Sequence, residues 1–133
     1  MKHLEVVAGI VINNGKILCV KRGESKNSEV SFKWEFPGGK IEPNEKNEDA
    51  LLRELFEELK INVTNVKYFF TSNYIYSNFS ISLHGYLCEV QNLNNFTLTE
   101  HVDFKWLSVC ELKDLCWAPA DLPIVKKLQL ENF

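Results

Sequence analysis

The chain alternates between apolar runs and polar segments over most of its length. The apolar runs are rich in β-branched and aromatic side chains, which favours strands. The runs predicted as strands are residues 4–12, 16–22, 65–77, 79–90 and 104–109. An Asn-Asn-Gly sequence between the first two runs predicts a hairpin turn. Residues 23–31 are polar and predict a loop, whereas residues 33–45 mix a short strand with proline and glycine.

Three further segments predict helices. Residues 48–60 carry apolar positions at helical spacing, and residues 110–115 predict a short helix. Residues 121–130 predict a terminal helix with a proline in its first turn. Strands mixed with two or three helices predict an α+β or α/β fold, and the length suits a single domain over residues 1–133.

The longest predicted helix has an apolar stripe. Leu51, Leu55 and Leu59 fall on one line of a helical wheel, and Leu52 and Phe56 lie beside it. We expect all five side chains to face the core.

Three glutamates fall on the opposite side of the same helix. Glu54, Glu57 and Glu58 are neighbours there, next to the small side chain of Ala50. Like charges at this spacing repel by about 0.2–0.5 kcal/mol per pair. They also lie towards the helix end that prefers cations. One interpretation is a solvated acidic face; the other is a site for Mg²⁺ or Mn²⁺, which prefer carboxylate oxygens.

The sequence Phe-Pro-Gly-Gly-Lys precedes this helix. Its pair Gly38 and Gly39 allows the backbone to approach a ligand closely, with carbonyls that can bind a metal and amides that can face phosphate. We therefore expect Gly39 and Lys40 to contact a substrate. A simple turn is the alternative, but the acid cluster that follows favours a site.

Composition and charge limit the function classes. The 133 residues contain 15 Lys and Arg and 18 Asp and Glu, so the net charge of −3 does not favour a nucleic acid polymer as partner. No Cys-x-x-Cys pair supports a zinc site, and Cys19 and Cys88 lie in apolar runs where reduced, buried thiols are expected. Without a signal-like segment or an apolar run of about 20 residues, we expect a cytoplasmic protein with no membrane partner.

These residues together resemble the Nudix hydrolase signature, G-x5-E-x7-R-E-U-x-E-E-x-G-U, where U is a bulky aliphatic residue. The pattern runs from Gly39 through Glu45 to Arg53 and ends at Ile61, and eight of its nine specified positions are filled. The exception is Lys60, which replaces the glycine that ends the helix in the family. The similarity to short MutT-type members of the family extends over nearly the whole chain.

The resemblance implies an α/β/α sandwich with a mixed sheet between helices, and cleavage of a nucleoside diphosphate linked to another group. The implied cofactor is Mg²⁺, with Mn²⁺ possible in its place. The implied ligands are the carbonyl of Gly38 and the carboxylates of Glu54, Glu57 and Glu58.

The same resemblance implies roles for two further charged residues, Arg53 and Glu100. Arg53 resembles the arginine that orients a glutamate, here Glu45, although a surface ion pair is the alternative. Glu100 resembles a loop acid that lies six residues before a tryptophan, here Trp106, and is a candidate metal ligand. Glu54 and Glu100 are the candidate general bases, and a merely solvated Glu100 is the alternative.

Three positions are expected to contact the nucleotide. The alternatives are a strand-end surface charge for Arg22, a core aromatic for Phe36 and a helix N-cap for Asp121. An ionised Asp121 only accepts hydrogen bonds, so it favours an exocyclic amine such as cytosine N4.

The expected function is Mg²⁺-dependent hydrolysis of a nucleoside triphosphate to a monophosphate and pyrophosphate, leaning towards cytidine nucleotides. The first alternative is an 8-oxo-dGTP sanitiser. The second, from another class, is a domain that senses a nucleotide without catalysis. The expected partner is a small nucleotide, and the assembly is a monomer or a homodimer.

Overall fold

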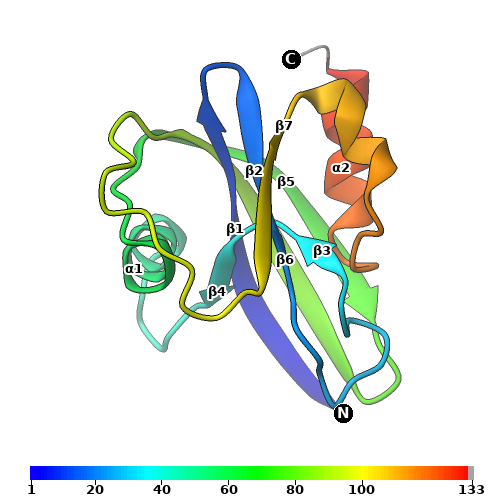
Figure 1. Ribbon diagram of the computed structural model, residues 1–133. Helices are drawn as coiled ribbons and strands as arrows, with labels where there is room; N and C mark the ends of the chain where they lie inside the picture. The colour runs from blue at the N-terminus through cyan, green and yellow to red at the C-terminus, as the bar shows by residue number, and fades with distance from the viewer. Residues whose placement is uncertain (132–133) are drawn as a thin grey trace.

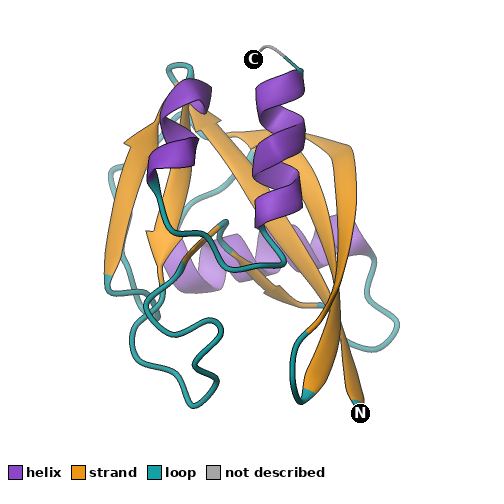
Figure 2. Cartoon of the chain, turned by 90° about the vertical axis from the view of Figure 1, so that its right-hand side faces the viewer, coloured by secondary structure: helices purple, strands orange, loops and turns teal. Residues whose placement is uncertain are grey.

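The computed structural model describes residues 1–131 and consists of a mixed β-sheet with one α-helix on each face (Figure 1). Viewed from the α2 side, α1 lies behind the sheet (Figure 2). The elements are β1 (Lys2–Asn13), β2 (Lys16–Lys21), β3 (Trp34–Glu35), β4 (Gly38–Lys40), α1 (Asn47–Leu59), β5 (Thr64–Ile75), β6 (Phe79–Glu89), β7 (Asp103–Leu107), the 3-10 helix η1 (Val109–Asp114) and α2 (Leu122–Leu130). The predicted α+β class is confirmed.

The predicted elements recur with small changes at their ends. Each strand expected from an apolar run is present, with ends shifted by at most two residues. Residues 33–45 form two short strands, β3 and β4, where one was expected. Residues 110–115 fall largely within a 3-10 helix. Among residues 1–131, no helix is both long and apolar enough to span a membrane.

The sheet has the order β3-β2-β1-β6-β5, with β4 paired to β1 and β7 paired to β2. The central pair β1 and β6 is parallel, from Lys2 opposite Phe79 to Ile12 opposite Glu89, and the other pairs are antiparallel. Gly38 pairs with Ala8, and a Cβ on Gly38 would collide with the Val7 carbonyl. Glycine is therefore required where β4 joins the centre of the sheet.

Two apolar clusters form the core, one on each face of the sheet. Side chains alternate along β1, so Val7 and Val11 face α1 whereas Ala8 and Ile10 face α2. The α1-side cluster also contains Leu18, Leu51, Leu55 and Leu59, and the α2-side cluster contains Ile17, Leu112, Ile124 and Leu128. Each helix is thus fixed to the sheet by its own cluster.

The predicted core face of α1 is partly wrong. Leu51, Leu55 and Leu59 are fully buried, but Leu52 is 41% exposed and Phe56 is 49% exposed. Ala50 and Glu58 are buried instead, so the acids do not share one solvated side. The cause is the loop between β6 and β7, which covers the flank of α1 where Glu58 lies.

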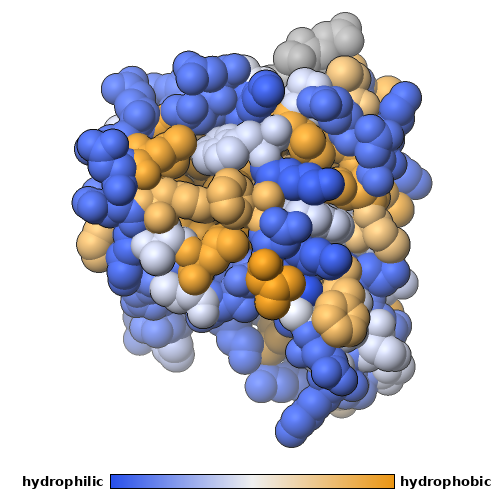
Figure 3. Space-filling view, in the orientation of Figure 1, coloured by the Kyte–Doolittle hydropathy of each residue, from blue (hydrophilic) through white to orange (hydrophobic). Residues whose placement is uncertain are grey.

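This covering loop is fixed to the end of α1 by hydrogen bonds. Thr99 Oγ1 donates to the Glu58 carbonyl at 2.9 Å, and the Thr97 amide donates to the Leu59 carbonyl at 3.0 Å. Phe96 of the loop meets Phe104 of β7 edge to face at 4.9 Å between ring centroids. Figure 3 shows hydrophobic side chains gathered on the face that carries β7 and this loop. The loop therefore brings residues 100 and 101 to the flank of α1.

Candidate active site

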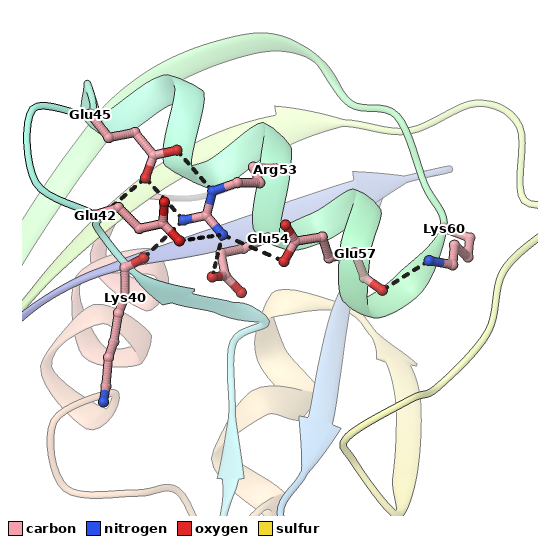
Figure 4. A network of polar contacts seen from close by, with 7 residues as sticks. All are labelled: Lys40, Glu42, Glu45, Arg53, Glu54, Glu57 and Lys60. Carbon is pink, nitrogen blue, oxygen red and sulfur yellow. Dashed lines mark hydrogen bonds and ion pairs between the residues drawn. The ribbon is translucent and has the colours of Figure 1, made fainter.

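Arg53 of α1 lies at the centre of a polar network (Figure 4). Its Nε and Nη2 donate to the two oxygens of Glu45 at 2.8 and 2.9 Å, so the predicted pair is present. Its Nη2 also donates to the Lys40 carbonyl at 3.1 Å, and its Nη1 donates to Glu54 Oε1 at 2.8 Å. The hydrogen bonds from Arg53 are the main cause that lowers the pKa of Glu45 to about 2. Arg53 therefore ties α1 to the chain segment around β4.

Glu54 lies against β4. A Cβ on Gly39 would collide with its carboxylate, so the glycine gives Glu54 room beside the strand. Partial burial raises the pKa of Glu54, and Arg53 opposes that effect. Glu57 is 59% exposed and lies 3.5 Å from Arg53 Nη1. Arg53 thus holds Oε1 of Glu54 and leaves its Oε2 without an ion pair to this arginine.

Glu58 lies at one end of a buried chain of charges. Its Oε2 is 2.8 Å from Nδ1 of His101, and Nε2 of His101 is 2.7 Å from Oε2 of Glu35. Arg22 Nε donates to the other oxygen of Glu35 at 2.9 Å. Burial alone would lower the pKa of His101, but Glu35 and Glu58 outweigh it and raise the pKa to about 9. The imidazole is therefore a cation between two carboxylates at neutral pH.

Sequence reasoning missed both middle members of this chain. Glu35 lies in the segment 33–45, which predicts only a short strand, and His101 follows Glu100 in a loop, but neither is predicted as a site residue. No spacing rule joins these two residues, which are 66 positions apart. The available signal was a histidine next to a candidate site acid in a loop.

Glu100 is exposed and faces the same region. Partial desolvation of its carboxyl is the main cause that raises the pKa of Glu100, and the charge of the nearby Glu58 adds to the effect. Glu100 lines a polar cavity of about 660 Å³ together with Arg22, Glu35, Gly38, Gly39, Lys40, Glu54 and His101. Neither Glu57 nor Glu58 lines this cavity.

No group of three or more His, Cys, Asp or Glu side chains within residues 1–131 is already arranged to hold a metal ion. The donor chemistry nevertheless fits a hard divalent cation. Glu58 is 2% exposed and its Oε2 pairs with His101, but its Oε1 has no hydrogen-bond partner, which is unfavourable for a buried carboxylate oxygen. Glu54 adds a partly buried carboxylate with a raised pKa. A bound cation would satisfy the oxygens of both.

A second cavity of about 320 Å³ adjoins the first. Its apolar wall includes Phe36, Tyr76, Phe79 and Ile81, and Asp121 also lines it. Arg22, Glu35, Gly38, Gly39 and Lys40 line both cavities. The five residues expected to contact a nucleotide, Arg22, Phe36, Gly39, Lys40 and Asp121, are therefore brought together around it.

Asp121 occupies the N-cap position of α2, as the helix-cap alternative expects, but its side chain makes no capping hydrogen bond. Its Oδ2 instead accepts the Phe36 amide at 3.0 Å. The carboxyl is 5% exposed, and burial, followed by the charge of Glu35, raises its pKa well above the usual range.

Two aromatic residues shape the apolar cavity. Phe36 is buried and packs on Trp117 with ring centroids 4.7 Å apart, so it is a core residue as well as a wall of the cavity. Tyr76, which the sequence did not single out, accepts the Ala120 amide at 3.0 Å through its hydroxyl oxygen. Burial raises the pKa of Tyr76 to about 12, so the ring stays neutral. The cavity can therefore hold a flat, mostly apolar group.

Comparison with known proteins gives one family. The family model described as NUDIX domain matches residues 3–128. The CTP pyrophosphohydrolase of Escherichia coli (strain K12) is 38% identical over 127 residues, which cover 95% of this chain and 91% of that protein. The 8-oxo-dGTP diphosphatase of the same strain is 32% identical over 130 residues, which cover 97% of this chain and 98% of that protein.

Solved structures show the same likeness. The solution structure of the E. coli ORF135 protein superposes on this chain with a TM-score of 0.81 at 36% identity. The superposition covers 99% of this chain and 93% of that one. Sequence and structure thus lead to the same group of proteins.

Proposed function

Because this chain belongs to the NUDIX family of hydrolases, we propose that it hydrolyses a nucleoside triphosphate to a monophosphate and pyrophosphate with Mg²⁺, preferring cytidine nucleotides. The family makes the chain an enzyme that acts on nucleotides. Its relatives carry names for both a cytidine and an oxidised guanine substrate, so the base must be argued from the site.

The two adjoining cavities support a nucleotide substrate. The apolar cavity suits a base, and the polar cavity suits a chain of phosphates. Arg22 and Lys40 line both cavities and offer positive charge at their junction. A nucleotide spanning the junction would place its phosphates beside Glu54 and Glu100.

The cation would be held by the acids on α1 together with one residue of β4 and one of the loop before β7. The residues assigned to it are the carbonyl of Gly38 and the carboxylates of Glu54, Glu57, Glu58 and Glu100. When bound, Mg²⁺ supplies positive charge to the phosphate oxygens and helps to place the attacking water. Arg53 fixes Glu54 Oε1 before any cation arrives.

Two carboxylates are candidates for the base that removes a proton from water. Burial raises the pKa of both Glu54 and Glu100, which brings each carboxylate nearer to the working pH of a general base. We favour Glu54, because its hydrogen bond from Arg53 fixes the orientation of its carboxylate. Glu100 is the alternative.

The buried carboxyl group of Asp121 is the observation that supports a preference for cytidine. Its carboxyl oxygens can accept a hydrogen from cytosine N4 in either protonation state. Because its pKa is raised, the neutral form becomes accessible, and that form can also donate its proton to the adjacent ring nitrogen N3. A neutral carboxylic acid thus matches the donor and acceptor pair on this edge of cytosine.

The same chemistry keeps 8-oxo-dGTP as a second candidate. Oxidation at C8 gives guanine a ring N–H at position 7 beside the O6 acceptor, and a neutral carboxylic acid can also pair with that edge. Unmodified guanine has two acceptors on that edge, so through that edge it offers a neutral Asp121 only one hydrogen bond. We therefore expect dGTP to be the poorer substrate in either case.

The test is a kcat/KM panel with Mg²⁺ over CTP, dCTP, 5-methyl-dCTP, 8-oxo-dGTP and dGTP. We expect a cytidine nucleotide to give the highest value. Asp121→Ala should reduce the preference for cytidine over dGTP by about 10-fold, since it removes both the donor and the acceptor, and one good bidentate base contact is worth about 1–3 kcal/mol. The control variant is Glu57→Gln, which should lower turnover of all substrates without changing their order.

Two outcomes contradict the proposal. If no triphosphate yields a monophosphate in the wild-type protein, the assigned reaction is wrong. If 8-oxo-dGTP exceeds every cytidine nucleotide, the reaction stands and the second candidate replaces the first.

A further inference from the structure

The glutamates of α1 are divided between two basic side chains, Arg53 and His101. Arg53 forms ion pairs with Glu54 and Glu57 from within the helix. Glu58 forms its ion pair with His101, which comes from the loop before β7. Within residues 1–131, no other ion pair to Glu58 is present, although its carboxylate is the most deeply buried of the three.

His101 is itself held on both sides. Its side chain is 7% exposed, and its second ring nitrogen contacts Glu35 at 2.7 Å. Glu35 in turn accepts a hydrogen bond from Arg22, and both residues line the two cavities. A continuous line of contacts therefore runs from the apolar cavity, which we assign to the base, to the flank of α1.

We propose that His101 is a positioning residue, which fixes the Glu58 carboxylate for the divalent cation and ties it to the Arg22–Glu35 pair that faces the nucleotide. The proposal rests on the proposed function, because that function assigns Glu58 to the cation. His101 touches neither the cation nor the reacting phosphate in this role.

The direction in which cation affinity changes when His101 is removed distinguishes a positioning role from a simple charge effect. If His101 acted only as a nearby positive charge, its removal would reduce repulsion and tighten binding of a divalent cation. If it positions Glu58, its removal leaves a buried carboxylate with no fixed orientation and weakens binding. Partners that orient metal ligands are worth about 10–100-fold in metal affinity.

The experiment measures Mn²⁺ binding to the whole protein by EPR, without any nucleotide. We expect His101→Asn to weaken Mn²⁺ binding by about 10-fold. Glu35→Gln should weaken it by a smaller factor in the wild-type background and add nothing in the His101→Asn background. The matched control is His84→Asn, because His84 also pairs with a glutamate, Glu5, but lines neither cavity. Its Mn²⁺ affinity should equal that of the wild type.

Unchanged or tighter Mn²⁺ binding in His101→Asn overturns the proposal. So does an effect of Glu35→Gln that persists in full when His101 is absent. If His101→Asn fails to fold by circular dichroism, His101→Gln takes its place.

A spectroscopic measurement needs no variant. Pulsed EPR of Mn²⁺ bound to the wild type should show no nitrogen coupling from a directly bound imidazole, and such a coupling would overturn the positioning role. Since no nucleotide is present, a protein that hydrolyses no triphosphate but loses Mn²⁺ affinity in His101→Asn contradicts the proposed function and keeps this inference.

Discussion

At the scale of single residues, Arg53 is the main cause of the low pKa of Glu45. The carboxylate accepts two hydrogen bonds from Arg53 and one from the Glu42 amide at 3.0 Å. These bonds lower its pKa from 4.5 to about 2. A carboxyl group with a lower pKa in the folded state stabilises the fold wherever it is ionised in both states. Its contribution is therefore complete above the unfolded pKa and is lost as the pH falls through the folded one.

We expect Glu45→Gln to be less stable than the wild type at neutral pH. The difference in free energy of unfolding between the two proteins should stay constant above about pH 4.5 and shrink between pH 4.5 and 2. Urea denaturation at several pH values across this window measures it. A difference that does not change with pH contradicts the assignment of the shift to the Arg53 contact.

The signature residues could be predicted from the sequence because their roles follow from fixed spacing along one helix and one loop. Arg53 and Glu45 are such a pair, and the structure joins them. The contact between His101 and Glu35 could not be predicted from the sequence. It depends on how the loop that carries His101, 66 positions after Glu35, packs against β3. The raised pKa of Asp121 could not be predicted from the sequence either, since it depends on burial by several separate segments.

At the scale of elements, α1 ends without the glycine of the family pattern. Lys60 adopts the left-handed conformation that glycine favours, with φ 59° and ψ 39°, and its amide donates to the Phe56 carbonyl. Its ammonium donates to the Glu57 carbonyl at 3.2 Å and lies 5.4 Å from the centre of the Phe56 ring. The helix therefore ends as the family pattern implies, although with a strained residue.

Lys60→Gly should stabilise the protein. The left-handed conformation is unfavourable by about 1–2 kcal/mol for a residue with a Cβ, and loss of an exposed cation–π contact offsets about 0.5–1 kcal/mol of that, so we expect a net gain of roughly 0.5–1 kcal/mol. The measurement is the midpoint of urea unfolding. The matched control is Lys60→Ala, which keeps the strain and loses the contacts, and should therefore destabilise. Equal effects of both substitutions contradict this explanation.

The helical wheel of α1 predicted the helix and its leucine stripe but not its full buried arc. Leu52 and Phe56 lie on one side of that stripe, and Ala50 and Glu58 lie on the other. Both sides are equivalent on a wheel, and only the path of the loop between β6 and β7 decides which one is covered. That path depends on contacts such as Thr99 with the Glu58 carbonyl, which leave no periodic pattern in the sequence.

At the scale of the whole molecule, two of the four cysteines lie in the apolar clusters, one in each. Cys19 belongs to the α2-side cluster and Cys88 to the α1-side cluster, and burial raises the pKa of each thiol to about 12. Cys110 and Cys116 are exposed, and all four thiols are free. The expectation that Cys19 and Cys88 are buried is confirmed.

We expect two thiols of the native protein to react rapidly with Ellman's reagent and two to react only through global unfolding, since a buried thiol is neither accessible nor ionised. Peptide mass spectrometry should assign the rapid pair to Cys110 and Cys116. Denaturant should release the other pair together, because each apolar cluster fixes a helix to the same sheet. Rapid modification of Cys19 or Cys88 alone would indicate that one face opens independently.

The two adjoining cavities have a consequence for how such proteins diverge. The acids of α1 lie on one side of the sheet, whereas Asp121 and Tyr76 belong to the opposite side, beside α2. Substitutions at residue 121 or 76 can therefore change which base is accepted without disturbing the acids of α1, which we assign to hydrolysis. A gene copy could acquire a new nucleotide target through a few changes near its C-terminal helix, under selection that leaves the reaction itself intact.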